Sequence, residues 1–164
     1  AVMAIAEMED GLIFNGNEEL GIKGLLNADG VQSLKLGKWD ELGTAADDVI
    51  KALTTLDNAG FHGPYLLALE PGLYNLLFRR YPQGNQTELA HIEEMLHSKV
   101  VKAPGIKKGG VLLASGRQFA SIVLGQDLVT GFIGPDGPDY EFKIVESLAP
   151  KIRVPESICV LKAA

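Results

Sequence analysis

The chain has 164 residues, of which 46% are hydrophobic and 22% charged, a composition that suits one compact domain or two small packed ones. Its net charge is −6 and no basic run exceeds a pair, which argues against a nucleic-acid partner. No apolar run approaches the roughly 18 residues that span a bilayer, and we find no secretory signal, so we expect a cytoplasmic protein without a membrane partner. The single cysteine, Cys159, cannot form an internal disulfide, which agrees with a reducing compartment.

The first 14 residues predict an amphipathic helix. Its apolar side chains recur at steps of three and four residues, at Ala1, Ile5, Met8 and Leu12. No capping residue precedes this helix, a pattern typical of a helix cut from a longer one. We therefore expect the chain to lack an N-terminal part.

Turns, a strand and a second helix follow. Glycines bracket a tight turn at residues 21–26, and Asp29-Gly30 predicts another turn before an alternating strand at residues 31–36. Thr44 is expected to cap a helix that ends at Gly60. The side chains that this helix is expected to bury are Val49, Ile50, Leu53 and Leu56.

The middle of the chain alternates between strand and helix. Residues 64–69 are almost all apolar, which predicts a strand covered on both faces. Pro71 is placed where the first turn of a helix tolerates proline, and Pro82 ends this segment. Thr87 is expected to cap a third helix. The apolar positions of these two helices are Leu73, Leu76 and Leu77, then Leu89, Ile92 and Leu96.

Strands dominate after residue 98. Residues 135–139, with the sequence Pro-Asp-Gly-Pro-Asp, predict a turn between two of the strands. Because helices and strands are mixed first and strands then dominate, the pattern indicates an α+β fold rather than repeated βαβ units. The expected strands cover residues 99–103, 110–115, 119–124, 128–133, 140–148 and 151–161.

One group of residues has the spacing of metal ligands, namely His91, Glu94 and His97. It contains a single Glu-x-x-His step on a short helix, whereas di-iron bundles need two such steps and two further glutamates on long helices. A solvated polar face opposite Leu89 and Ile92 is the favoured interpretation. We therefore expect no metal site.

The remaining candidates for catalysis are weak. Ser98 and Ser115 lack a nucleophile-elbow motif, and Cys159 lies between apolar residues where a buried, inert thiol is expected. Gly37-Lys38 lacks the preceding glycine and the following hydroxyl residue of a phosphate loop. We expect no catalytic residue, no cofactor and no enzymatic activity. Three carboxylate pairs are expected on the solvated surface, at Asp40-Glu41, Asp47-Asp48 and Glu93-Glu94.

Several motifs, in order along essentially the whole chain, resemble the encapsulin nanocompartment family, whose members have also been labelled linocins or bacteriocins. Residues 9–16 and 21–26 resemble the end of that family's central helix, and residues 63–65 resemble the entry to its next buried strand. Residues 124–132 resemble the return to the family's peripheral domain. Residues 154–161 resemble its closing strand.

The resemblance implies the fold of tailed-phage major capsid proteins and assembly into closed icosahedral shells in the cytoplasm. The peripheral domain would comprise residues 1–21 and 125–164, and the apical domain residues 22–124. The implied partners are further copies of the chain and a cargo enzyme, such as a peroxidase or a ferritin-like iron-storage protein. The family's cargo-docking helix, its extended loop and most of the flavin site reported in some members would precede residue 1.

The resemblance also implies two functional segments. A pore loop at the fivefold vertex would consist of Arg79, Arg80, Tyr81, Pro82, Gln83, Gly84 and Asn85. An ordinary interhelix loop whose arginines complement a helix C-terminus is an equally good interpretation. A groove for the cargo's C-terminal targeting peptide would include Val129, Gly131 and Phe132. A half-buried strand is the alternative interpretation of these three residues.

Three other functions stay open. A phage or prophage coat protein would share the fold and package DNA, although the acidic balance disfavours it. A secreted bacteriocin or peptidase would need a secretion signal and a nucleophile motif, neither of which we find. An unrelated α+β hydrolase is the third, and turnover by a monomer would favour it.

Overall fold

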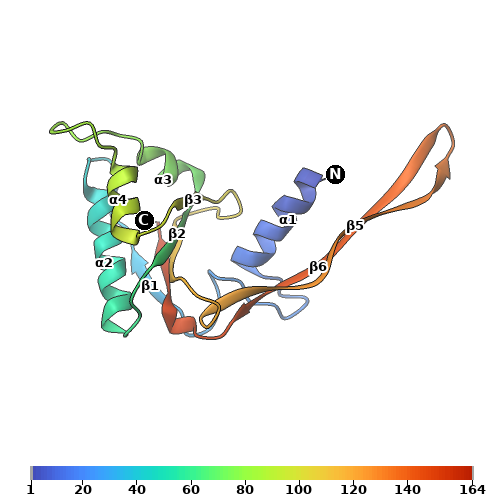
Figure 1. The fold of residues 1–164 in the computed structure, drawn as a ribbon, viewed down its shortest axis with the longest axis horizontal. Helices are drawn as coiled ribbons and strands as arrows, with labels where there is room; N and C mark the ends of the chain where they lie inside the picture. The colour runs from blue at the N-terminus through green and yellow to red at the C-terminus, as the bar shows by residue number, and fades with distance from the viewer. Residues whose placement is uncertain (1, 164) are drawn as a thin grey trace.

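The computed structural model describes residues 2–163, which form a helix-covered sheet and a long two-stranded arm (Figure 1). This mixture of helices and strands confirms the expected α+β class. The helices are α1 (Val2–Asn15), α2 (Thr44–Asn58), α3 (Pro71–Leu76), α4 (Glu88–Leu96) and the 3-10 turn η1 (Pro155–Ser157). The strands are β1 (Gln32–Lys35), β2 (Tyr65–Leu69), β3 (Val100–Lys102), β4 (Gly110–Ala114), β5 (Ala120–Asp136), β6 (Asp139–Ile152) and β7 (Ile158–Lys162).

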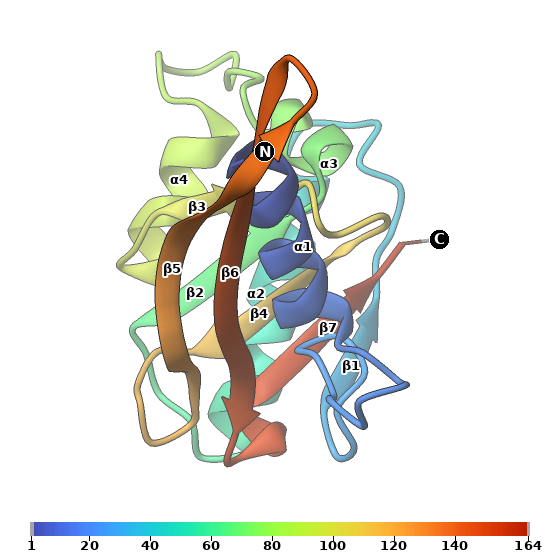
Figure 2. The same cartoon turned by 90° about the vertical axis from the view of Figure 1, so that its right-hand side faces the viewer.

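The body of the molecule is a mixed five-stranded sheet with the order β1-β7-β4-β2-β3 (Figure 2). The outer pairs β1–β7 and β2–β3 are parallel, whereas β4 runs antiparallel to both β2 and β7. Helices α2 and α4 pack against strands of this sheet. The second sheet contains only β5 and β6.

Alternating side chains of the body strands form two cores. In β4, Leu112 packs in the cluster beneath α2 and α4, while Val111 packs in the cluster that includes Phe14 of α1. Both strand residues are fully buried. Because successive residues of a strand point to opposite faces, this alternation requires cover on both sides of the sheet. The strand predicted at residues 64–69 to be covered on both faces is buried at Leu67 and Leu69, but not along its whole length.

Helix α2 differs from its sequence prediction at its start. Gly43, rather than Thr44, is the capping residue and adopts a left-handed conformation with φ 97°. The Thr44 hydroxyl instead donates a hydrogen bond to the carbonyl oxygen of Glu41 at 2.6 Å. Ile50 was expected to be buried but is 45% exposed. In contrast, Thr87 caps α4 as predicted, accepting a hydrogen bond from the N–H of Ala90 at 3.2 Å.

The exposed positions of the other helices also correct the predicted apolar stripes. Met8 of α1 and Leu76 of α3 are exposed, because one side of each helix faces away from the sheet. Ala1 lies outside the described residues. Leu66 of β2 is exposed as well, so this strand is not covered along its whole length.

The later strands are longer and fewer than the sequence predicts. Residues 119–124 and 128–133 were expected to form two strands, but all of them except Phe119 belong to the single strand β5, which runs for 17 residues. Residues 151–161 were expected to be one strand, but η1 divides them between β6 and β7. The boundaries between the apical and peripheral domains stay a prediction. Within the predicted division, β7 was grouped with residues 125–164, and the structure pairs it with β1 and β4 of the body.

Two glycines allow the turn after α1. Gly16 has φ 72°, and a Cβ atom on Gly24 would lie 2.4 Å from the carbonyl oxygen of Phe14. Only glycine permits both that conformation and that approach. The turn carries hydrogen bonds from the N–H groups of Leu25 and Leu26 to the carbonyls of Ile13 and Phe14. The predicted turn is therefore what joins α1 to the body.

Candidate functional site

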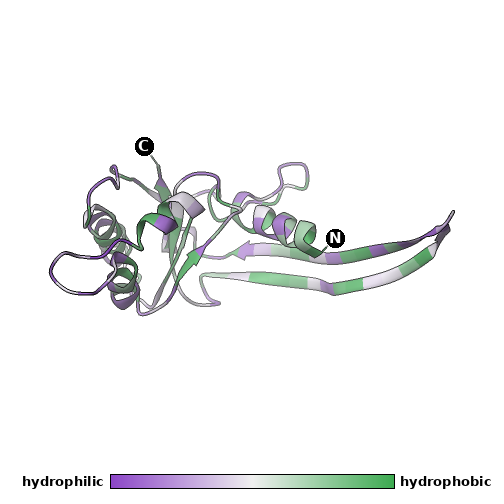
Figure 3. Cartoon of the chain, turned by 90° about the horizontal axis from the view of Figure 1, so that it is seen from above, coloured by the Kyte–Doolittle hydropathy of each residue, from purple (hydrophilic) through white to green (hydrophobic). Residues whose placement is uncertain are grey.

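The hairpin of β5 and β6, here called the arm, leaves many large apolar side chains in solvent. The strands pair from Ala120 and Ile152 at the base to Asp136 and Asp139 at the tip. Figure 3 shows that hydrophobic segments recur along both strands. The exposed apolar side chains of the arm are Ile122, Val123, Leu124, Leu128, Val129, Phe132, Ile133, Tyr140 and Phe142. Isolated two-stranded hairpins are marginal in water, so a surface of this kind needs cover.

The outer half of the arm has two chemically different faces. Phe132 lies opposite Phe142, with ring centroids 5.4 Å apart, and 6.1 Å from the ring of Tyr140. These three exposed residues form the aromatic face. Val129 and Gly131 alternate with Phe132 in a regular stretch of β5, so they point to the other face. The structure thus brings together Val129 and Gly131 of the predicted cargo groove, but not Phe132.

Helix α1 packs near the base of the arm on the aromatic side. At each irregularity of the strand register, the extra residue is in β5. The side chains of β6 therefore alternate between the two faces without interruption, and Glu146 lies on the same face as Phe142. Glu146 contacts Glu9 of α1. A hydrogen bond with Glu9, partial burial and the negative charges of Glu9 and Asp127 raise the pKa of the Glu146 carboxyl.

The predicted pore residues lie in one loop between α3 and α4. Its ends are joined by hydrogen bonds from the N–H of Glu88 to the carbonyl of Arg79 at 2.9 Å, and from Leu89 to Leu77 at 2.8 Å. Arg80 forms a bridge with Thr87. The loop residues beyond these joined ends are exposed, namely Pro82, Gln83, Gly84, Asn85 and Gln86.

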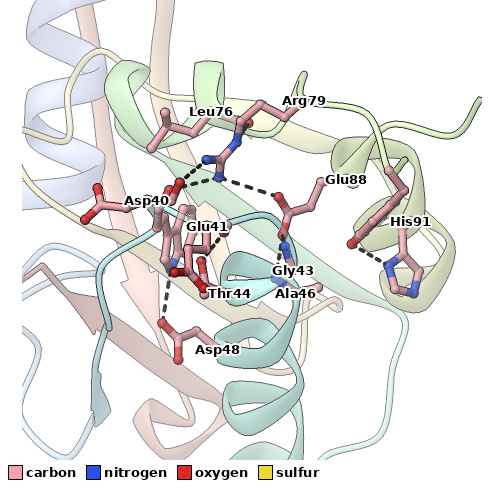
Figure 4. Close-up of polar contacts among 12 residues, drawn as sticks. Asp40, Glu41, Gly43, Thr44, Ala46, Asp48, Leu76, Arg79, Glu88 and His91 are labelled. Atoms are coloured by element: carbon pink, nitrogen blue, oxygen red, sulfur yellow. Dashed lines mark hydrogen bonds and ion pairs between the residues drawn. The ribbon is translucent and has the colours of Figure 1, made fainter. Parts of the chain in front are cut away.

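Arg79 points back into the body rather than toward the loop tip (Figure 4). Its Nε donates to the carbonyl of Leu76 at the C-terminus of α3, at 3.0 Å. Its two Nη atoms donate to the carbonyls of Asp40 and Trp39 at 2.9 and 2.8 Å. The predicted complement to a helix C-terminus is therefore present for Arg79. Arg80 is exposed and donates instead to the side-chain oxygen of Asn85.

A shallow depression of about 400 Å³ lies beside the loop. Tyr81 and His91 contribute to its lining, with the tyrosine hydroxyl 3.1 Å from Nδ1 of the histidine. Burial, followed by the negative charges of Glu88 and Asp47, raises the pKa of the Tyr81 hydroxyl. Gln83 and Gln86 of the loop line the same depression.

The predicted metal-ligand spacing does not form a cluster. His91 contacts Tyr81, and His97 is the exposed left-handed residue that ends α4, with φ 54°. Among residues 2–163, no three histidine, cysteine or acidic side chains are arranged to hold a metal ion.

Two of the candidate nucleophiles, Cys159 and Ser98, make contacts within the body. Cys159 of β7 is fully buried, and burial raises the pKa of its thiol to about 11. The Ser98 hydroxyl donates to the carbonyl of Tyr65. Neither has the exposed, activated environment that a nucleophile requires.

Two buried acidic residues were missed by the sequence reasoning. Asp48, expected on the surface, is buried and accepts hydrogen bonds from the N–H of Gly37 at 2.8 Å and from the indole of Trp39 at 3.0 Å. Lys51 donates to its other oxygen at 2.9 Å. Glu88 is fully buried beneath the loop. Asp48 and Glu88 lie near the N-termini of α2 and α4, where acidic residues are common, and nothing in the sequence indicates that they are buried.

Comparison with known protein families identifies the family of the chain. Residues 1–149 match the family Linocin_M18, described as "Encapsulating protein for peroxidase". The chain belongs to the encapsulin family. This encapsulin is 31% identical over 163 residues to a diheme-cytochrome-encapsulin shell fusion protein of Kuenenia stuttgartiensis, with 99% of the chain and 45% of the relative covered.

Solved structures agree on the fold. A virus-like particle from Pyrococcus furiosus matches 96% of this encapsulin chain and 63% of its own, with a TM-score of 0.82 and 24% identity. The capsid of an empty GTA particle matches 99% of this chain and 63% of its own, with a TM-score of 0.72 and 13% identity. The expected capsid-like fold is confirmed. The chain spans about half the length of the curated relative and under two thirds of these structures.

In the described part of this encapsulin, no helix has both the length and the apolar character needed to cross a bilayer.

Proposed function

We propose that this encapsulin is a self-assembling shell subunit that encloses a cargo enzyme in the cytoplasm and performs no catalytic step itself. The observation that carries the proposal is the arm. Its apolar side chains are exposed on a two-stranded hairpin that has little cover within the chain, so contact with further copies would bury them. Repeated contacts of one kind between identical subunits lead to closed, symmetric assemblies.

The assembly test compares arm variants with a matched variant on the body. The double variant Phe132→Ser with Phe142→Ser removes two of the three residues of the aromatic face, whereas Phe78→Ser changes a similarly exposed phenylalanine outside the arm. Sedimentation velocity and electron microscopy of the expressed protein should show particles for the parent and for Phe78→Ser, but smaller species for the double variant. A lone monomer for the parent at high concentration would contradict the proposal.

The cargo proposal assigns the targeting peptide to the face that carries Val129 and Gly131. Gly131 has open space where a side chain would be, with only the Lys143 carbonyl near, at 3.9 Å, and a glycine in a strand permits close approach of another backbone. The match to a family of encapsulating proteins for peroxidase favours a peroxidase as cargo, and a ferritin-like protein stays a second prediction. A fused cytochrome in the Kuenenia stuttgartiensis relative agrees with a redox cargo.

Peptide binding can separate the two faces of the arm. We expect Val129→Ser and Gly131→Val to weaken binding of the cargo's C-terminal peptide, measured by calorimetry on assembled shells. Phe132→Ser, on the aromatic face, should leave the peptide affinity unchanged in whatever particles remain. Equal loss in all three variants would contradict binding to one face.

The pore proposal assigns solute entry to residues 79–85. The exposed tip at Gln83 supports it, because a bulky side chain there would narrow any opening formed by symmetry-related loops. We expect Gln83→Trp to slow entry of small solutes into shells, measured by stopped-flow quenching of an enclosed dye. Gln118→Trp, at an exposed position outside this loop, is the control. Equal entry rates in the two variants would contradict the pore role.

A further inference from the structure

Glu88 is a buried carboxylate at the junction of three helices. It lies in the first turn of α4, yet its Oε1 accepts hydrogen bonds from the N–H groups of Gly43 at 3.0 Å and Ala46 at 3.2 Å. These two groups belong to the N-terminus of α2, whose own capping residue is a glycine without a side chain. A carboxylate is favoured there because it satisfies free N–H groups and complements the helix dipole. Glu88 thus caps α2 from another helix.

The second oxygen of Glu88 faces Arg79. Its Oε2 has no hydrogen-bond partner among the described residues, and the nearest cation is Nη2 of Arg79 at 3.7 Å. The same guanidinium holds the carbonyl of Leu76 at the end of α3 and those of Trp39 and Asp40. The pair therefore connects the end of α3 to the start of α2 (Figure 4).

The two members of this pair are also the two ends of the loop. The Glu88 N–H donates a hydrogen bond to the carbonyl of Arg79 at 2.9 Å. The main-chain hydrogen bond and the side-chain contact therefore join the same two ends of the loop. Tyr81 adds a hydrogen bond from its N–H to the carbonyl of Gln86 at 3.1 Å. The tip at residues 82–86 is exposed, and its side-chain hydrogen bonds are those from Arg80 to Asn85 and from Gln86 to Glu94.

We propose that Glu88 is the positioning residue of the loop: with Arg79 it fixes both loop ends to α2 and α3 and restricts movement to residues 82–86. Arg79 is engaged in the body, and the exposed Arg80 is the one charged residue among residues 80–87. The positioning role needs no pore. Its consequence for solute entry rests on the proposed function, because only a shell has an interior to enter.

Amide hydrogen exchange, resolved by NMR, tests the positioning role in the whole chain. Glu88→Ala should accelerate exchange at Gly43, Ala46 and Leu89 by about tenfold or more, as local opening no longer requires breaking these contacts. Amides of the central strand β2 should keep the parent rates. Glu94→Gln, an exposed carboxylate of the same helix, is the matched control and should change none of them.

Glu88→Gln is the conservative variant that separates capping from pairing. Its amide oxygen can still accept from Gly43 and Ala46, so these two amides should stay within about threefold of the parent, while Leu89 exchanges faster because the charge that attracts Arg79 is gone. This variant also keeps the test valid should Glu88→Ala fail to fold.

Two results would overturn the inference. Unchanged exchange at Leu89 in both variants would show that Glu88 does not hold the loop ends. Equal acceleration at the β2 amides would show a general contribution to stability instead of positioning. Dye entry distinguishes the two proposals: if Gln83→Trp does not slow entry while Glu88→Ala frees the loop ends, the pore role fails and the positioning role stands.

Discussion

The body and the arm contain similar apolar side chains but expose them very differently. In the body, Leu67, Leu112 and Leu161 are buried to 1% or less exposure by helices and by neighbouring strands. In the arm, Val129 is 50% exposed to solvent and Phe132 is 60% exposed. The body therefore obtains its hydrophobic stabilisation within one chain. The arm leaves this apolar surface exposed within the described residues, and the proposed assembly would cover it.

The sharpest test of this comparison is truncation of one leucine in each region. Leu112→Ala should lower the free energy of unfolding by about 2–5 kcal/mol, because a fully buried side chain leaves a cavity. Leu128→Ala, in the arm, should change it by less than about 0.5 kcal/mol in the unassembled chain. Urea unfolding followed by circular dichroism measures both. Comparable losses would show that the arm is buried within the single chain after all.

The aromatic face should affect association more than folding. The variant Phe132→Ser with Phe142→Ser should weaken self-association at least about tenfold, or roughly 1.4 kcal/mol. Its free energy of unfolding as a single chain should stay within about 0.5 kcal/mol of the parent. Analytical ultracentrifugation over a concentration series measures the first quantity and urea unfolding the second. Unaltered association would remove the aromatic face from the interface.

Asp48 predicts an acid-dependent contribution from the body. Burial alone would raise the pKa of its carboxyl. Hydrogen bonds from Lys51, Trp39 and the N–H of Gly37 outweigh this effect, so the pKa lies below the usual 3.8. The folded state therefore binds this proton less tightly than the unfolded state. The contribution of Asp48 to the free energy of unfolding is complete above about pH 4 and is lost as the pH falls through the folded pKa.

The variant Asp48→Asn isolates this contribution. It should cost about 1 kcal/mol at neutral pH, because the charged acceptor is lost. The difference from the parent should shrink in acid, as measured by urea unfolding at several pH values. Asp47→Asn, at the exposed neighbouring position, is the control. A difference that does not depend on pH would contradict the role of the Asp48 charge.

The smallest expected effect concerns the contact between the arm and α1. The pKa of Glu146 is raised, so its stabilising effect is complete below the ordinary value of 4.5 and is lost as the pH rises through the folded pKa. Amide exchange at the α1–β6 contact should therefore accelerate as the pH is raised, after correction for intrinsic exchange. Glu146→Gln should abolish this dependence, whereas Glu141→Gln near the tip should not. The same profile in both variants would contradict the assignment.

The sequence predicted the body better than the arm, for a physical reason. The pattern of apolar residues predicted β4 and α4 correctly. The reason is that the chain itself buries their apolar side chains, so the pattern reflects contacts within the chain. In β5, Gly125 and Gly134 resemble breaks between strands, although the chain passes through them in extended form with irregular register. Glu88 could not be recognised as buried, since its partners at Gly43, Ala46 and Arg79 meet it only in the folded chain.

Amide exchange of the arm before and after assembly is the most direct test of the central claim. The experiment uses the protein as its host expresses it, with particles separated from subunits by sedimentation. Residues 128–133 and 140–145 should exchange rapidly in the subunit and become protected by about a hundredfold or more in the particle, while β4 is protected in both. An arm that exchanges equally fast in particle and subunit would contradict the account.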